Sequence, residues 1–166
     1  MPDSKRLLIV GTGGQGRLCR EIALAMGCFE KIDFIDDNSG LAVGRLSEIE
    51  NLRSEYNCAF VALGNNRLRS EVTEKLEALD FEIPVLIHPT AYISPSAVLG
   101  NGSVIAPKTV INTGAVLGKG CIASIGALID HDCSIGSFVH INTGAICMAG
   151  SKVPAFTKVD AGEVYK

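Results

Sequence analysis

Every sixth residue from Leu99 onward is aliphatic or small, and this period constrains the fold more than any other feature of the chain. The residue two places before each of them is also small or aliphatic, and because strand side chains alternate, both point to the same side. Glycine follows the sixth position at Gly100, Gly118 and Gly136, so three hexads make one coil. An ordinary sandwich would space its turns irregularly, whereas this pattern predicts a left-handed parallel β-helix built from hexapeptide repeats. The series reads Leu99, Ile105, Ile111, Leu117, Ala123, Ile129, Ile135, Ile141, Cys147, Val153 and Val159.

The residues between these two columns should face away from the core, yet the first of them are apolar. They are Val98, Val104, Val110, Val116, Ile122 and Leu128, followed by Ser134 and His140. Apolar outer faces need a partner to cover them, which predicts an oligomer. We expect chemistry where Ser134 and His140 interrupt the apolar series.

Composition and charge exclude several classes of function. A length of 166 residues with 47% hydrophobic residues is enough for a core, and a net charge of -3 without a basic run argues against nucleic-acid binding. There is no stretch of 18 apolar residues, and the N-terminus leads straight into a short strand, so we expect neither membrane insertion nor a signal segment. Six cysteines without a CxxC pair are interpreted as buried thiols in a reducing cytoplasm, with no metal site.

The N-terminal half has the pattern of an α/β nucleotide-binding fold. An apolar strand, 7–10, runs into a glycine-rich loop and a helix, and a second strand, 31–35, ends in two aspartates. A third strand, 58–63, leads to a Gly-Asn-Asn turn and another helix, and a last short strand covers 83–87. We therefore expect a Rossmann-like domain over 1–88 and the β-helix over 89–166.

The glycine loop predicts a phosphate site at the start of the first helix. Backbone at Gly11, Gly13 and Gly14 can approach a phosphate closely, and Asp36 or Asp37 is placed to accept hydrogen bonds from a ribose or base. Only half of a dinucleotide-binding fold precedes the repeat. A single nucleotide therefore fits better than NAD.

Over essentially its whole length, the chain resembles the bacterial nucleotide-sugar N-acyltransferases. This family includes the enzymes that acetylate UDP-4-amino-sugars for bacillosamine and the sialic-acid O-acetyltransferase relatives. The likeness rests on the Rossmann-like half, the His88-Pro89 junction, the run Ala-Tyr-Ile-Ser-Pro-Ser-Ala at 91–97 and the hexads that follow. Its most specific element is Ile-Asp-His-Asp-Cys-Ser-Ile-Gly at 129–136, followed by His140 nine residues after His131.

The resemblance implies a role for several residues. His131 would be the general base, Asp132 would orient it, and His140 would lie beside the acetyl group, with Gly150 as a further acyl-donor contact. An imidazole that titrates near neutrality suits the removal of a proton from an attacking amine. The other histidine, His88, is interpreted as structural. The implied nucleotide-sugar contacts are Gly11, Gly13, Gly14, Gln15, Asp36, Asp37 and Asn65.

Three departures from the family pattern qualify this interpretation. Gln15 stands where related enzymes often carry histidine, and Ser124 stands where some have asparagine near the acetyl site. Relatives continue for further hexads that help to hold coenzyme A between subunits, whereas this sequence reaches Lys166 earlier. Lysines in the last hexads would lie near the phosphates of the coenzyme in relatives, or they merely solvate the surface.

The resulting hypothesis is a cytoplasmic homotrimer that transfers an acetyl group from acetyl-CoA, a co-substrate, to a nucleotide-linked amino-sugar for a bacterial surface glycan, without a metal. The expected nucleotide is UDP. Its alternative is a non-catalytic nucleotide-sugar-binding protein with a degenerate acyl-donor site. A nicotinamide-dependent oxidoreductase is disfavoured because the second half of a dinucleotide fold is missing.

Overall fold

The computed structural model describes residues 4–166, which form two compact units that divide between Pro84 and Val85. The division falls four residues before the boundary that we expected. Strand β4 (Leu86–Ile87) explains the difference, because it pairs with a strand of the second unit, Leu86 with Val104 and Ile87 with Ile105. The strand expected over 83–87 is therefore shorter than predicted and belongs to the solenoid.

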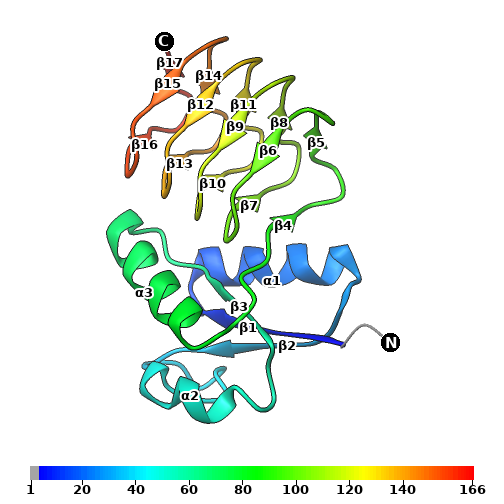
Figure 1. The fold of residues 1–166 in the computed structure, drawn as a ribbon, viewed down its shortest axis with the longest axis vertical. Helices are drawn as coiled ribbons and strands as arrows, with labels where there is room; N and C mark the ends of the chain where they lie inside the picture. The colour runs from blue at the N-terminus through cyan, green and yellow to red at the C-terminus, as the bar shows by residue number, and fades with distance from the viewer. Residues whose placement is uncertain (1–3) are drawn as a thin grey trace. The chain divides into compact units, whose positions relative to one another are not determined.

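The first unit contains a parallel three-stranded sheet in the order β2-β1-β3 (Figure 1). Its helices are α1 on one face, and α2 and α3, whose residues join one core cluster, on the other. The elements are β1 (Lys5–Val10), α1 (Gly14–Met26), β2 (Phe29–Ile35), a 3₁₀ turn η1 (Leu46–Glu48), α2 (Ile49–Leu52), β3 (Cys58–Val61) and α3 (Asn66–Ala78).

Helices on both faces explain why β1 from Leu7 onward and the whole of β3 are continuous apolar runs. Leu7, Leu8 and Ile9 are all fully buried, and Val10 is nearly so, although neighbouring side chains point to opposite faces. The helices that the sequence predicted are present. On α3, Leu68 is exposed and lines a cavity instead of the core.

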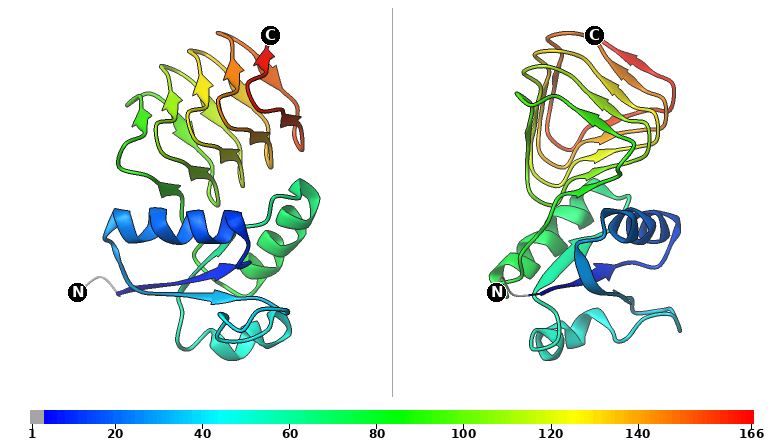
Figure 2. Two further views of the ribbon diagram at one scale, coloured as in Figure 1. Left: turned by 180° about the vertical axis from the view of Figure 1, so that it is seen from behind. Right: turned by 90° about the vertical axis from the view of Figure 1, so that its right-hand side faces the viewer.

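The second unit is a solenoid of short parallel strands stacked into three sheets, the predicted left-handed β-helix, and the right-hand view of Figure 2 shows its three-sided coils. Paired residues are eighteen apart, as in Ile105 with Ala123 and Ala123 with Ile141. The strands after β4 are β5 (Tyr92–Ile93), β6 (Val98–Leu99), β7 (Val104–Ile105), β8 (Val110–Ile111), β9 (Val116–Leu117), β10 (Ile122–Ala123), β11 (Leu128–Ile129), β12 (Ser134–Ile135), β13 (His140–Ile141), β14 (Ile146–Cys147), β15 (Lys152–Val153), β16 (Lys158–Val159) and β17 (Val164–Tyr165).

The two sequence columns form the core of this solenoid. Ile105, Ile111 and Ile129 are fully buried, and they pack in one cluster with small residues such as Ala115 and Ala127. The hexad period thus places in the core one large side chain from each strand and one small side chain from the turn residue just before that strand. The apolar core accounts for the stability of the stack.

The outward apolar residues do not all behave alike. Val104 and Ile122 are buried in the single chain, so they offer no free surface to a partner. The sheet β17-β14-β11-β8-β5 instead carries an apolar outer column in which three members are exposed: Tyr92, Leu128 and Val164. Val98 and Val116 of the neighbouring sheet are exposed as well.

Candidate active site

The glycine loop of the first unit contains two kinds of glycine: some are required by the backbone conformation, and others leave the surface of the loop open to a ligand. Gly11 has φ +102°, and a Cβ atom on Gly16 would lie 2.0 Å from the carbonyl oxygen of Gly11. Gly13 is the N-cap residue of α1 without a side-chain cap, and a Cβ atom on Gly13 or Gly14 would meet nothing within 4 Å. The open side of the loop therefore presents the N-terminus of a helix, where an anion is stabilised.

Asp36 is committed to the loop itself. Its Oδ2 accepts hydrogen bonds from the backbone N–H and the hydroxyl of Thr12, at 2.9 and 2.8 Å, and its Oδ1 accepts one from the Asn38 N–H. These bonds, that from Asn38 first, hold the pKa of the Asp36 carboxyl below its usual range. Asp36 thus ties the glycine loop to the end of β2. Asp37 is engaged likewise, because its Oδ1 accepts the Leu46 N–H at 2.8 Å.

A cavity of about 310 Å³ opens beside these aspartates, at the carboxyl ends of the strands. Its walls combine apolar side chains with the carboxylates, a composition that suits a nucleobase and ribose. Asp36, Asp37 and Gly11 of the predicted contacts line it, whereas Gly13, Gly14, Gln15 and Asn65 do not. The lining residues are Val10, Gly11, Ile35, Asp36, Asp37, Asn38, Leu46, Leu63, Leu68 and Val72.

The Gly-Asn-Asn turn after β3 has a structural explanation. The Asn65 Oδ1 accepts the Leu68 N–H at 3.0 Å and so caps α3. Arg69, a fully buried residue that we did not predict, donates to the carbonyl oxygen of Leu63 at 2.9 Å and to the Asn66 Oδ1 at 2.7 Å. The sequence signal that could have pointed to Arg69 is its spacing: it follows Asn66 by three residues in the first turn of a helix, so the two side chains can meet.

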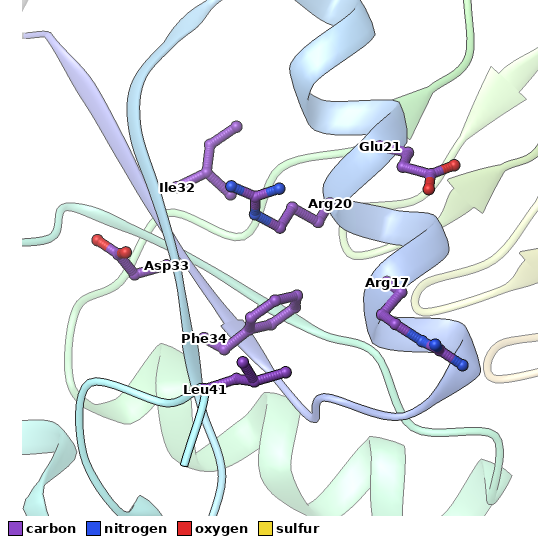
Figure 3. Close-up of a pocket in the computed structure, with 7 residues that line it drawn as sticks. All are labelled: Arg17, Arg20, Glu21, Ile32, Asp33, Phe34 and Leu41. Atoms are coloured by element: carbon purple, nitrogen blue, oxygen red, sulfur yellow. The ribbon is translucent and has the colours of Figure 1, made fainter. Parts of the chain in front are cut away.

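Figure 3 shows a second hollow of the first unit, about 420 Å³ in volume, between α1 and β2. Arg20 extends toward β2, whereas Arg17 points away from Ile32. The Asp33 carboxylate at its rim already accepts the Tyr56 hydroxyl at 2.6 Å. None of its lining residues was predicted as a contact from the sequence; they are Arg17, Arg20, Glu21, Ile32, Asp33, Phe34 and Leu41.

In the second unit, the turn between β11 and β12 places His131 against the next residue of the chain. The His131 Nδ1 and the Asp132 Oδ2 lie 2.8 Å apart, and both side chains are exposed. Asp132 has φ +59°, a left-handed conformation that aspartate tolerates better than most residues. This backbone lets two adjacent side chains meet, and the structure so brings together the predicted base and its carboxylate.

The Asp132 contact fixes the properties of the imidazole. Hydrogen bonding to Asp132, with the nearby charges of Asp130 and Asp132, raises the pKa of His131 above its usual value. With Nδ1 engaged, Nε2 is the nitrogen left for an incoming proton, and among residues 4–166 no hydrogen bond to it is seen. Such a dyad can act as a general base.

His140 lies elsewhere on the coil, in β13. Its Nε2 is 3.0 Å from the hydroxyl of Ser124, a residue that is 9% exposed. The turn that carries His131 joins the sheets of β11 and β12, so it is the corner opposite the sheet of β13. A single chain therefore does not bring His131 and His140 together, although both were predicted for one site.

Gly150 lies one coil after His131. Its N–H donates to the His131 carbonyl oxygen at 2.9 Å, so this amide supports the dyad turn. A shallow hollow of about 400 Å³ beside Gly150 is lined by Met148, Ala149, Gly150, Ser151, Lys152 and Lys166. Its lysines give it a positive edge that suits the phosphates of an acyl donor.

Two further observations concern possible metal ligands and membrane-spanning helices. Within the described part of the chain, no cluster of three or more His, Cys, Asp or Glu side chains is arranged to hold a metal ion. In the same residues, no helix combines the length and the apolar character needed to cross a bilayer.

Comparison with known proteins places this arrangement in a class. Residues 6–76 match the family described as the PglD N-terminal domain. The chain is 36% identical to the acetyltransferase domain of PglB from Neisseria gonorrhoeae, solved in complex with acetyl coenzyme A, with a TM-score of 0.86 over 96% of this chain and 89% of that one.

Two other relatives are associated with different nucleotides, one through its bound ligand and one through its name. PerB from Caulobacter crescentus, solved with CoA and GDP-perosamine, is 29% identical with a TM-score of 0.87 over 97% of this chain and 88% of that one. The UDP-N-acetylbacillosamine N-acetyltransferase of Bacillus subtilis is 32% identical over 111 residues, or 61% of this chain. That match spans 51%, about half, of the Bacillus protein.

The Rossmann-like α/β unit, the left-handed β-helix and the His131–Asp132 pair together define the class of this protein, a hexapeptide-repeat acyltransferase. More specifically, the chain belongs to the family of acetyl-CoA-dependent sugar N-acetyltransferases that includes the PglB acetyltransferase domain.

Proposed function

We propose that this protein transfers the acetyl group of acetyl-CoA to the amino group of a nucleotide-linked amino-sugar. The observation that carries the proposal is the His131–Asp132 dyad, an exposed imidazole held through Nδ1 at 2.8 Å. The sugar nitrogen attacks the thioester carbonyl carbon, and the C–N bond forms while the C–S bond breaks. The amine proton passes to Nε2 of His131 and from there to the departing sulfur, so that coenzyme A leaves as the thiol and His131 is neutral again.

The first unit would bind the nucleotide of the acceptor. In this proposal the base and ribose occupy the cavity beside Asp36 and Asp37, and the diphosphate lies over the open side of Gly13 and Gly14. A nucleoside diphosphate sugar is the ligand class that this combination suits. UDP and GDP both occur among relatives, and UDP is our first choice because the bacillosamine-type relatives carry it.

A homotrimer would complete the site. His131 and His140 lie on opposite sides of a coil, so a site that uses both needs two copies of the chain. The exposed outer column of the β17-β14-β11-β8-β5 sheet offers apolar surface for such an assembly. At about 25 cal/mol per Å², burial of these side chains would stabilise the contact.

Acetyl-CoA would lie beside Gly150, with Lys152 and Lys166 near its phosphates. His140, held by Ser124, would contribute to the acetyl pocket from the neighbouring copy. The six free thiols suit a reducing compartment, so the proposed location is the cytoplasm, where the product would serve surface-glycan synthesis.

The test is an acetyl-transfer assay with acetyl-CoA and a UDP- or GDP-linked 4-amino-sugar, with the acetylated product followed by mass spectrometry. We expect acetylated sugar with one of the two nucleotides and none when the amine is blocked. Binding of the nucleotide-sugar without any acetylation at millimolar acetyl-CoA would favour the alternative, a non-catalytic binding protein.

A further inference from the structure

The turn that presents His131 begins with a second aspartate, Asp130. Its Oδ1 accepts the backbone N–H of His131 at 2.7 Å and the Asn112 Nδ2 at 3.0 Å. Asn112 stands eighteen residues earlier, at the same turn position of the preceding coil. A side chain of one coil thus holds the carboxylate that starts the turn of the next.

Asn112 is itself held in place. Its Oδ1 accepts the backbone N–H of Thr113 at 2.7 Å, which directs its Nδ2 toward the coil that carries Asp130. The turn after β13 repeats the local pattern, because the Asn142 Oδ1 accepts the Thr143 N–H at 2.8 Å. Asparagine therefore satisfies this turn geometry at two other positions of the same molecule.

A carboxylate at position 130 is consequently not required by the turn. It adds a negative charge that asparagine would not add, directly beside the imidazole. The hydrogen bond from the His131 N–H, followed by that from Asn112, lowers the pKa of Asp130, so the carboxylate stays charged when His131 titrates.

We propose that Asp130, anchored by Asn112 of the preceding coil, is a positioning residue that strengthens His131 as a base. This inference rests on the proposed function for its catalytic consequence, and on the geometry of the turn alone for its effect on the imidazole. Asp132 orients the ring through Nδ1. Asp130 fixes the backbone at His131 and stabilises the imidazolium by charge.

The other groups around this turn carry little competing charge. The facing turn of the preceding coil, 112–114, and that of the following coil, 148–151, contain no ionisable side chain. The nearby Cys133 and Cys147 thiols are buried, which raises their pKa values, that of Cys147 to about 12, so they remain neutral. Lys152 and Lys166 line the hollow beyond Gly150 and act in the opposite direction.

The test is the substitution Asp130→Asn, read by NMR titration of the histidine rings in the intact protein. The chain has three histidines, so the His131 signal is assignable by its loss in His131→Ala. Because asparagine keeps the turn, we expect a folded protein in which the His131 pKa is lower than in the wild type. Asp160→Asn, in a turn of another corner, is the control for the loss of one charge, and it should leave His131 unchanged.

Two further measurements separate a positioning role from a structural one. In Asp130→Asn, the acid limb of the acetyl-transfer pH profile should move to lower pH, and the plateau rate should fall several-fold because the base is weaker. Introduced alone, Asn112→Ala should lower the His131 pKa. Combined with Asp130→Asn, it should cause no further decrease, since Asn112 acts on His131 only through the Asp130 carboxylate.

Equal His131 titration in the wild type, Asp130→Asn and Asp160→Asn would overturn the inference. Because the NMR readout needs no substrate, it stands or fails apart from the proposed function. Absence of acetyl transfer in the wild type would overturn that function and leave the titration result intact.

Discussion

The carboxylate of Asp132 lies over Gly114, the residue at the equivalent turn of the preceding coil. A Cβ atom on Gly114 would stand 2.6 Å from the Asp132 Oδ1. The partner of the His131 imidazole therefore occupies space that the glycine leaves open. The turn that carries the proposed base in one coil thus depends on the absence of a side chain in the coil before it.

We expect Gly114→Ala to lower acetyl-transfer activity by displacing Asp132. Gly114 has φ +69°, so alanine there also strains the backbone, by about 1–2 kcal/mol. Gly144→Ala is the matched control, because Gly144 has φ +65° with nothing within 4 Å of its Cβ position. Both variants should lose similar thermal stability, and only Gly114→Ala should lower kcat. Equal activities in the two variants would contradict this role of Gly114.

The two kinds of glycine in the first unit should respond differently to alanine. Gly13→Ala should fold normally, because its Cβ position is open, yet weaken nucleoside diphosphate binding, since the methyl group would meet the phosphates. Gly16→Ala should instead destabilise the first unit, because its Cβ would overlap the Gly11 carbonyl. Calorimetric titration with UDP and GDP, and thermal unfolding, distinguish these outcomes. Unchanged affinity in Gly13→Ala would move the phosphates away from this loop.

Assembly should depend on the apolar outer column of the β17-β14-β11-β8-β5 sheet. Leu128 is 40% exposed there, and Leu128→Glu would place a charge in the proposed contact. We expect a trimer for the wild type and a smaller species for Leu128→Glu in light scattering. Leu24→Glu, at an exposed leucine of α1, should remain a trimer. A wild-type protein that is monomeric at micromolar concentration would refute the shared site.

Acetyl-CoA binding should respond to the lysine edge of the hollow beside Gly150. Lys152→Glu reverses a charge next to the proposed phosphates, so we expect at least a several-fold weaker Kd for acetyl-CoA at low salt, with a smaller difference at high salt. Nucleotide-sugar affinity should not change, which serves as the internal control. If Lys152→Glu binds acetyl-CoA as the wild type does, the lysines only solvate the surface.

The solenoid was predictable from the sequence because the six-residue period corresponds to one side of each three-sided coil. Residues such as Ile105 and Ile129 recur every six positions because each coil has three sides, and burial of each excludes a polar alternative. The boundary between the two units was predicted less accurately, because apolar residues such as Leu86 and Ile87 would suit a strand of either unit. Their pairing with β7 is a long-range property that local pattern does not encode.

The candidate site was predictable in part. The adjacency of His131 and Asp132 needed no fold, apart from the left-handed backbone that lets their side chains meet. The contacts between coils, such as Asn112 with Asp130, join residues that are eighteen apart in the sequence. They could have been predicted by comparing polar residues, and not only apolar ones, at the eighteen-residue spacing of one coil. Asp36 follows β2, where the spacing placed an acidic residue, but its bonds to Thr12 depend on loop geometry that no spacing rule supplies, and its contact with a nucleotide stays a prediction.

The most direct test of the central claim is the acetyl-transfer rate of His131→Ala with saturating acetyl-CoA and the preferred nucleotide-linked amino-sugar. Removal of a general base lowers kcat by about 10²- to 10⁴-fold. Because His131 is exposed and its dyad lies on the surface of the solenoid, stability and affinity for both substrates should stay near those of the wild type. We predict such a selective loss of kcat, whereas an unchanged rate in His131→Ala would contradict the account.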